Sequence, residues 1–187
     1  MGAGPAGSAA AIQAAQSGLL TVLVEGSAFP RCRPGETLHP GIGSVLKQLG
    51  VATEVNTASE LRHSEIKIDW AGNRSRTRFD DPSDLSQLGY QISRSKLDTI
   101  LLNRAQRAGV DVRQPCRALA PILSEGRICG VETTLGPIRA AFTIDASGGV
   151  GWLRKKQSLA LYRVPRGCSQ GTGIVKADAR TSLRGHY

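Results

Sequence analysis

The chain has 187 residues, a length typical of one domain, and its 40% hydrophobic and 21% charged residues are ordinary for a soluble globular protein. Its net charge of +9 is unevenly distributed along the chain. Residues 1–150 hold 16 basic and 14 acidic side chains, whereas residues 151–187 hold 8 basic side chains and 1 acidic one. Aromatic residues make up only 4% and do not interleave with the basic ones, which argues against a nucleic-acid interface. Neither a membrane span nor a signal peptide is expected.

The first predicted helix begins at Pro5, which suits a first helical position, and runs through an alanine-rich segment to Gly18. The apolar run 20–24 is typical of a buried parallel strand and ends at Glu25. After a loop rich in Arg, Pro and Gly, apolar spacing predicts a helix over 40–49, which the next glycine closes.

Alternating residues over 65–70 and 74–79 predict two strands joined at Gly72-Asn73. A second long amphipathic helix is expected over 95–108, with a short strand after Gly109. An antiparallel meander with turns at Glu125-Gly126 and Gly136-Pro137 is predicted next. Its strands cover 118–123, 127–134 and 138–144.

This order predicts an α/β, Rossmann-like fold that combines a parallel sheet with an antiparallel meander. Residues 1–152 would form the nucleotide-binding domain, with a strand insert at about 60–90, and residues 153–187 a basic tail without periodicity. Met1 directly precedes the glycine-rich loop, so the expected first strand is absent. We therefore expect an incomplete sheet with a gap at its centre, in which the loop has lost its anchor.

Gly2, Gly4 and Gly7 fit the G-x-G-x-x-G pattern of dinucleotide-binding loops. The first glycine permits the tight turn, the second lets a pyrophosphate approach the backbone, and the third lets the helix pack closely. Glu25 lies near the spacing expected for an acid that accepts hydrogen bonds from the ribose. The alternative is a glycine-rich terminus without a ligand, but the helix and strand that follow in order favour dinucleotide binding.

Four motifs in order resemble FAD-dependent oxidoreductases, and most closely the flavin-dependent halogenase and aromatic-hydroxylase-like monooxygenase group, with geranylgeranyl reductases nearby. The first is the glycine loop with the strand end at 22–25, and the second is the strap 29–38, FPRCRPGETL. The third is 89–94 with Leu97-Asp98, which is similar to the start of the group's second long helix. The fourth is 144–148, IDASG, followed by 152–154.

The resemblance implies FAD as the cofactor and assigns contacts to its two halves. The pyrophosphate would lie against the glycine loop and the adenosine ribose against Glu25, while the strap would lie beside the flavin. Asp145 and Gly148 would close over the cofactor near its phosphates. The implied cofactor-binding residues are Gly2, Gly4, Pro5, Ala6, Gly7, Glu25, Arg33, Gly35, Glu36, Arg94, Asp145 and Gly148. Arg33 and Arg94 could instead be solvated surface charges, and Asp145 a turn cap.

The resemblance further implies a monooxygenase that acts through a flavin C4a-(hydro)peroxide on a small organic molecule, with electrons from NAD(P)H or a flavin reductase. A halogenase is the alternative reaction. Two other readings stay open: a non-catalytic remnant that no longer holds FAD, and, ranked last, a nucleic-acid-binding protein. The remnant is motivated by the absent first strand and by the lack of a Gly-Asp pair after residue 150.

Other residues are weaker candidates for a functional role. Lys67 lies roughly where halogenases place a catalytic lysine, yet its position favours an exposed strand residue, and the Trp-x-Trp-x-Ile-Pro signature is missing. His39 could face the flavin, although a helix-start histidine is the simpler interpretation. Four widely spaced cysteines without a CxxC pair argue against zinc and disulfides and favour reduced thiols in a cytoplasm. No metal site is expected.

Overall fold

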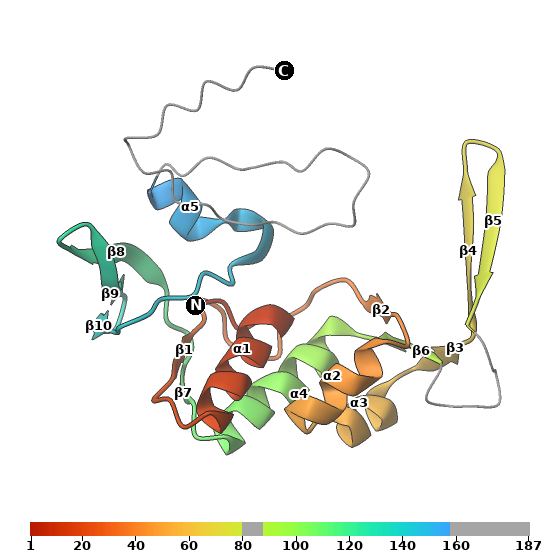
Figure 1. Ribbon diagram of the computed structural model, residues 1–187, viewed down its shortest axis with the longest axis horizontal. Helices are drawn as coiled ribbons and strands as arrows, with labels where there is room; N and C mark the ends of the chain where they lie inside the picture. The colour runs from red at the N-terminus through yellow and green to blue at the C-terminus, as the bar shows by residue number, and fades with distance from the viewer. Residues whose placement is uncertain (80–87, 158–187) are drawn as a thin grey trace.

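A group of helices forms the centre of the molecule in the computed structural model, which describes residues 1–79 and 88–157. The helices are α1 (Pro5–Gln16), α2 (Ile42–Leu49), α3 (Ala52–Ala58) and α4 (Arg94–Arg107). Figure 1 shows them side by side, with the strands β8, β9 and β10 at one end and the β4–β5 hairpin at the other. The fold is α/β, as predicted, and no helix within the described ranges is long and apolar enough to cross a membrane.

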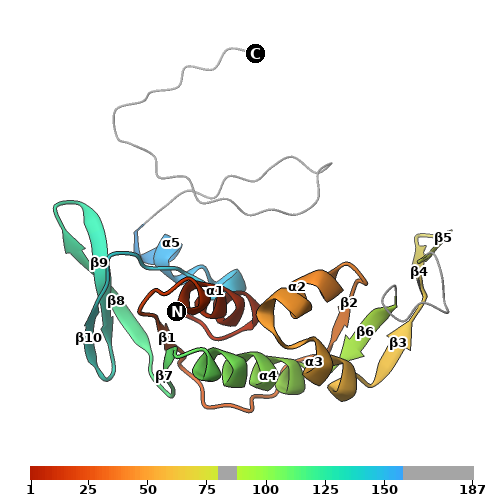
Figure 2. The same ribbon diagram turned by 60° about the horizontal axis from the view of Figure 1, so that its bottom comes forward.

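The main core lies where α1 packs against α4. Ile12 of α1 and Leu97, Leu101 and Ala105 of α4 are each at most 3% exposed. The alanine-rich face of α1 lets the two helix axes run close together, as Figure 2 shows. The burial of one face of α4 confirms the amphipathic helix predicted over 95–108, and the contact holds the start of α4 close to the start of α1.

The parallel part of the sheet is short. Strand β1 (Val22–Val24) pairs in parallel with β7 (Asp111–Arg113), and Leu23 and Val24 are buried. The sequence predicted a buried strand from residue 20, which was wrong for the first part, because no described element covers Leu20 and its side chain is fully exposed. The strand still ends at Glu25, whose amide donates to the Arg113 carbonyl at 3.0 Å.

The glycine loop is fixed from both sides by its first two residues. The amide of Gly2 donates to the Val24 carbonyl at 2.8 Å, and the amide of Ala146 donates to the Met1 carbonyl at 2.9 Å. The Met1 ammonium group also donates to the Ile144 carbonyl at 2.8 Å. These bonds bridge β1 and the segment after the meander, so the expectation of an unanchored loop was wrong.

A second, antiparallel sheet has the order β2-β6-β3. Its strands are β2 (Glu36–Leu38), β6 (Gly89–Ile92) and β3 (Leu61–His63). Helix α4 begins at Arg94, one residue before the start predicted at 95, because Ser93 caps the helix and its hydroxyl accepts from the Lys96 amide at 3.5 Å. Most of the motif 89–94 therefore lies in β6, directly before the helix. Pairing of β2 with β6 brings the strap next to the start of α4.

The meander forms as predicted, with one turn displaced. Its strands are β8 (Ala118–Ser124), β9 (Arg127–Thr133) and β10 (Gly136–Arg139). The second turn falls on 134–135 rather than on Gly136-Pro137, because the hydroxyl of Thr133 accepts from the Leu135 amide and donates to the Gly136 carbonyl. The last strand also ends before Phe142, whose side chain is 84% exposed.

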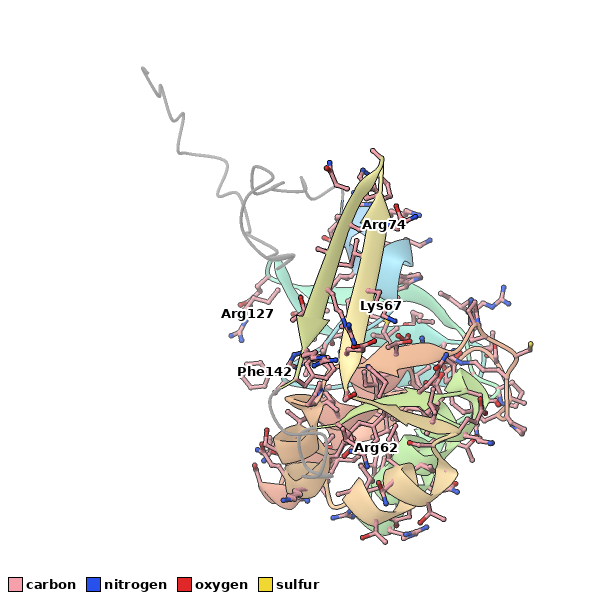
Figure 3. The ribbon with its side chains drawn as sticks, turned by 90° about the vertical axis from the view of Figure 1, so that its right-hand side faces the viewer. Arg62, Lys67, Arg74, Arg127 and Phe142 are labelled. Atoms are coloured by element: carbon pink, nitrogen blue, oxygen red, sulfur yellow. The ribbon has the colours of Figure 1, made fainter. Side chains whose placement is uncertain are left out.

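The β4 (Glu65–Trp70) and β5 (Asn73–Arg78) strands form the predicted hairpin, which stands away from the helices in Figures 1 and 3. One face carries the charged side chains, including Lys67 and Arg74, and the other carries Ile68 and Trp70. Because the ion pairs on the charged face are exposed to solvent, we expect them to add little stability.

The segment after the meander contains one short helix that the sequence did not predict, α5 (Trp152–Lys156). It follows a 3-10 turn, η2 (Gly148–Val150). The rest of the basic tail, 158–187, and residues 80–87 of the strand insert lie outside the described residues. The predicted boundary at residue 152 therefore falls on the first residue of α5.

Candidate functional site

A cleft of about 950 Å³ opens at the N-terminal end of α1. Its volume is at the upper end of the range of about 300–1,000 Å³ that is usual for small-molecule sites. Segments far apart in the sequence converge on it: the glycine loop, the end of β1, the strap, the start of α4, the start of β8 and the loop before α5. The fold therefore brings together all four sequence motifs at one place.

Most of the site residues predicted from the sequence line this cleft: Gly2, Gly4, Pro5, Ala6, Glu25, Arg33, Gly35, Glu36, Arg94 and Gly148. Gly7 and Asp145 are absent from its lining. The lining also includes four residues that were not among the predicted site residues: Arg31, Arg117, Ser147 and Trp152. Arg31 stands in the strap motif beside Cys32, so the motif offered a signal for it, but only Arg33 was assigned.

Two glycines of the loop are required by close backbone contacts. Gly2 has φ +90°, and a Cβ there would lie 2.5 Å from the Ala146 carbonyl oxygen. A Cβ on Gly7 would lie 1.7 Å from the Gly2 carbonyl oxygen. Gly7 thus lets the first turn of α1 pack on the loop, which is the packing role expected of a third glycine.

Gly4 leaves the end of the helix open. It is the N-cap of α1 without a capping side chain, and the first turn contains no acidic residue. A Cβ on Gly4 would point toward Arg31, 3.3 Å from its Nη2 atom. The unpaired N–H groups and the positive end of the helix dipole therefore face the cleft, an arrangement that attracts an anionic group.

Glu25 is a buried acid whose oxygens already accept three hydrogen bonds. Oε2 accepts from the Ala3 amide at 2.8 Å and from Arg31 Nη1 at 3.1 Å, and Oε1 accepts from the Ser27 amide at 3.0 Å. A carboxylate has about four acceptor positions, so roughly one remains for a ligand in the cleft. Glu25 thus joins the glycine loop to the strap.

Arg94 is held at the cleft by two carboxylates. Its Nε donates to Asp98 at 2.9 Å and its Nη1 donates to Glu36 at 2.8 Å. Hydrogen bonding to Asp98, the main cause, raises the pKa of Arg94 above its ordinary value, and Glu36 adds to the effect. Its side chain is only 19% exposed, which contradicts the surface-charge alternative, whereas Arg33 is exposed at the cleft.

Asp145 caps the loop that follows it, as the turn-cap alternative stated. Its carboxylate accepts from the amides of Ser147 at 3.0 Å and Leu153 at 2.8 Å. Burial alone would raise the pKa of Asp145, but hydrogen bonds from Ser147 and Leu153 outweigh it, and the pKa lies below its ordinary value. Asp145 therefore shapes the wall of the cleft through the backbone of 147–153.

We expect Asp145→Asn to destabilise the protein by about 1–2 kcal/mol at neutral pH, because one accepting oxygen becomes a donor facing an amide. Since the folded-state pKa is depressed, the stabilisation by Asp145 is present above its unfolded-state pKa and is lost as pH falls through the folded-state value. Urea unfolding across acidic pH measures both effects. Equal stability of the variant and the parent at neutral pH would contradict the capping role.

The remaining candidates stay away from the cleft. Lys67 lies on the β4–β5 hairpin, where Figure 3 labels it, and its side chain is exposed. Its ammonium group pairs with the Glu65 carboxylate at 3.1 Å. His39 accepts from the Gly41 amide at 3.0 Å, as expected of a helix-start histidine. The three cysteines within the described ranges are free, and those ranges hold no metal-binding group of side chains; Cys168 lies outside them.

The model of a protein family described as FAD dependent oxidoreductase matches residues 1–151. The chain belongs to the FAD-dependent oxidoreductase family. Among curated proteins it is 30% identical over 158 residues to a tryptophan 2-halogenase of Chondromyces crocatus, covering 81% of this chain and 30% of that protein. It is also 32% identical over 155 residues to digeranylgeranylglycerophospholipid reductase 1 of Methanococcoides burtonii, covering 79% of this chain and 36% of that protein.

A solved structure of a flavin-dependent halogenase is also similar to this chain. A myxobacterial chondrochloren halogenase superposes with a TM-score of 0.71 at 31% identity, covering 79% of this chain and 36% of the halogenase. The chain thus spans about a third of the length of the relatives it matches. The resemblance to the halogenase and hydroxylase group of FAD-dependent oxidoreductases is confirmed, with FAD as the cofactor of the family.

The cleft fits FAD on its own geometry. An open helix end with two arginines beside it suits a pyrophosphate, and Glu25 retains an acceptor position for a ribose hydroxyl. Any side chain on Gly4 would enter the space in front of the helix. These features are the ones that a dinucleotide site requires.

Proposed function

We propose that residues 1–152 form the FAD-binding domain of an FAD-dependent monooxygenase that acts on a small organic molecule. The pyrophosphate lies at the start of α1 against Gly2 and Gly4, and the adenosine ribose lies at Glu25. The flavin lies beside residues 33–36 of the strap. FAD, when bound, supplies the redox chemistry, and this part of the chain binds and orients it.

One observation carries this proposal: four motifs from distant parts of the sequence line one cleft at a helix N-terminus. The strap reaches the cleft because β2 pairs with β6, and the loop 146–149 reaches it because Ala146 bonds to Met1. The alternative of a non-catalytic remnant differs in one measurable way, because a remnant would retain no FAD on titration.

Halogenation is the second candidate reaction, because curated relatives include a tryptophan 2-halogenase and a brominase. Lys67 does not favour it, since this residue is exposed and lies on the hairpin. We propose NAD(P)H or a separate flavin reductase as the electron donor. A cytoplasmic location is proposed from the free thiols of the described cysteines.

We expect Ala6→Glu to weaken FAD binding about tenfold or more. Ala6 is an exposed residue in the first turn of α1 and lines the cleft. A carboxylate about 8 Å from a phosphate costs about 2 kcal/mol at an effective dielectric constant of about 20. The same charge favours the helix itself, so the melting temperature should not fall. Fluorescence titration with FAD measures the dissociation constant.

Ala6→Gln is the matched control, because it adds the same volume without the charge. We expect it to bind FAD within a few-fold of the parent chain. A parent chain that retains no flavin on titration would overturn the proposed function. Equal affinity of the Glu and Gln variants would place the phosphates elsewhere.

A further inference from the structure

Asp98 is a buried acid outside the cleft that contacts two of its arginines. Its side chain is 0% exposed, and it lies in the second turn of α4. Arg31 donates to Oδ2 from Nε at 3.3 Å and from Nη2 at 3.2 Å, while Arg94 donates to Oδ1 at 2.9 Å and to Oδ2 at 3.2 Å. One carboxylate thus holds two guanidinium groups from different segments.

The two guanidinium groups meet in front of α1. A Cβ built on Gly4 would lie 3.3 Å from Nη2 of Arg31 and 3.7 Å from Nη2 of Arg94. Phe29 supports Arg31 from another side, because its ring centroid lies 4.6 Å from the guanidinium carbon. The pair therefore stands at the open helix end, where an anionic group of a ligand would lie.

Each arginine keeps donors for a ligand. A guanidinium carries five N–H donors. Arg31 uses three, two toward Asp98 and one toward Glu25, and Arg94 uses three, two toward Asp98 and one toward Glu36. About two donors remain on each side chain, on the Nη atoms that border the cleft.

We propose that Asp98 is a positioning residue that holds Arg31 and Arg94 together as a clamp for the pyrophosphate, and that Arg31 couples this clamp to the ribose acid Glu25. The inference rests on the proposed FAD site and extends it to two residues, Arg31 and Asp98. Without Asp98, Arg31 would keep its contacts with Glu25 and Phe29. Arg94 would keep its ion pair with Glu36, but the carboxylate that holds the two guanidinium groups against each other would be gone. Preorganisation of the fork geometry is what a bidentate phosphate contact needs.

Asp98→Asn should weaken binding of ADP by about tenfold to a hundredfold, the effect of losing hydrogen bonds to a charged group. Adenosine, which lacks phosphates, should bind within about twofold of the parent value, because Glu25 and its backbone donors remain. Calorimetric titration with these two probes separates a phosphate effect from general loss of structure. The matched control is Asp111→Asn, which removes a half-exposed carboxylate paired with Arg113 outside the cleft.

A second readout does not need a ligand. In NMR spectra of the parent, the Nε–H signals of Arg31 and Arg94 should be protected from exchange, and Asp98→Asn should expose both. If that variant does not fold, Arg31→Lys replaces it, because an ammonium group keeps the charge but cannot bridge Asp98 and Glu25 as a planar fork does. We expect this variant to lose ADP affinity and to retain adenosine affinity.

The outcomes separate this inference from the proposed function. If the parent chain binds neither FAD nor ADP, the proposed function is overturned, and the clamp with it. If the parent binds both ligands and Asp98→Asn matches it for ADP, only the positioning role is overturned. Equal losses for ADP and adenosine also overturn it, because they indicate a purely structural role.

Discussion

Replacement of Gly7 by valine should prevent the glycine loop from forming and abolish FAD binding. The Cβ position lies 1.7 Å from the Gly2 carbonyl oxygen and 3.1 Å from Cβ of Ala146, so both the loop and the segment 144–147 must move. The movement would break the hydrogen bonds that tie Gly2 to Val24 and Ala146 to Met1. We expect a loss of about 4 kcal/mol or more, in the range that marks a specific structural failure.

Chemical denaturation followed by circular dichroism measures this loss, and FAD titration reports the site. Gly43→Ala is the control, because this glycine lies within α2 and a Cβ there would lie 3.8 Å from the Tyr90 hydroxyl, an ordinary contact. Alanine is favoured over glycine in a helix by about 1 kcal/mol, so the control should be at least as stable as the parent. A folded Gly7→Val chain that binds FAD normally would contradict the packing role of Gly7.

The helices that flank the site could be predicted because their signals are local. Pro5 at the start of α1 and the left-handed Gly50 after α2 act through their own backbone angles. The apolar spacing in α4 likewise belongs to one segment. The sequence therefore placed these elements within a few residues of their bounds.

The short strands of the β2-β6-β3 sheet could not be predicted from local sequence signals. β2, β3 and β6 contain only three or four residues each, and they exist because β6 pairs with both neighbours. Gly89–Ile92 directly precedes the helix predicted over 95–108, and no separate strand was predicted there. Only pairing with distant residues reveals it as a strand.

In the candidate site, too, local sequence patterns could be predicted, whereas contacts between distant residues could not. Glycine spacing and the acid at the end of β1 are sequence patterns, and they predicted Gly2, Gly4 and Glu25 at one cleft. The role of Arg31 depends on Asp98, which lies 67 residues further along the chain. Asp145, in contrast, matched a motif, but its carboxylate faces its own loop and not the cleft.

Removal of the Glu25 side chain should have the second large effect. In Glu25→Ala the amide of Ala3, a residue with 0% exposure, loses its acceptor, and Arg31 loses one partner. An unsatisfied buried donor costs about 1–3 kcal/mol, and breaking a buried ion pair costs about 3–5 kcal/mol. Because Arg31 keeps its ion pair with Asp98 in this variant, we expect a total near the sum of the two lower bounds, about 4 kcal/mol.

Urea unfolding tests this value against Glu54→Ala, which removes a surface partner of Arg107 and should cost less than about 0.5 kcal/mol.

A second test measures how the ribose of a bound nucleotide contacts Glu25. Three donors fill three of about four acceptor positions on Glu25, so the ribose can give it roughly one hydrogen bond. Of 2′-deoxy-ADP and 3′-deoxy-ADP, one should therefore bind about tenfold more weakly than ADP and the other nearly as well. Equal weakening by both would mean that both hydroxyls reach Glu25, and that Arg31 or Ser27 releases its bond when the ligand enters.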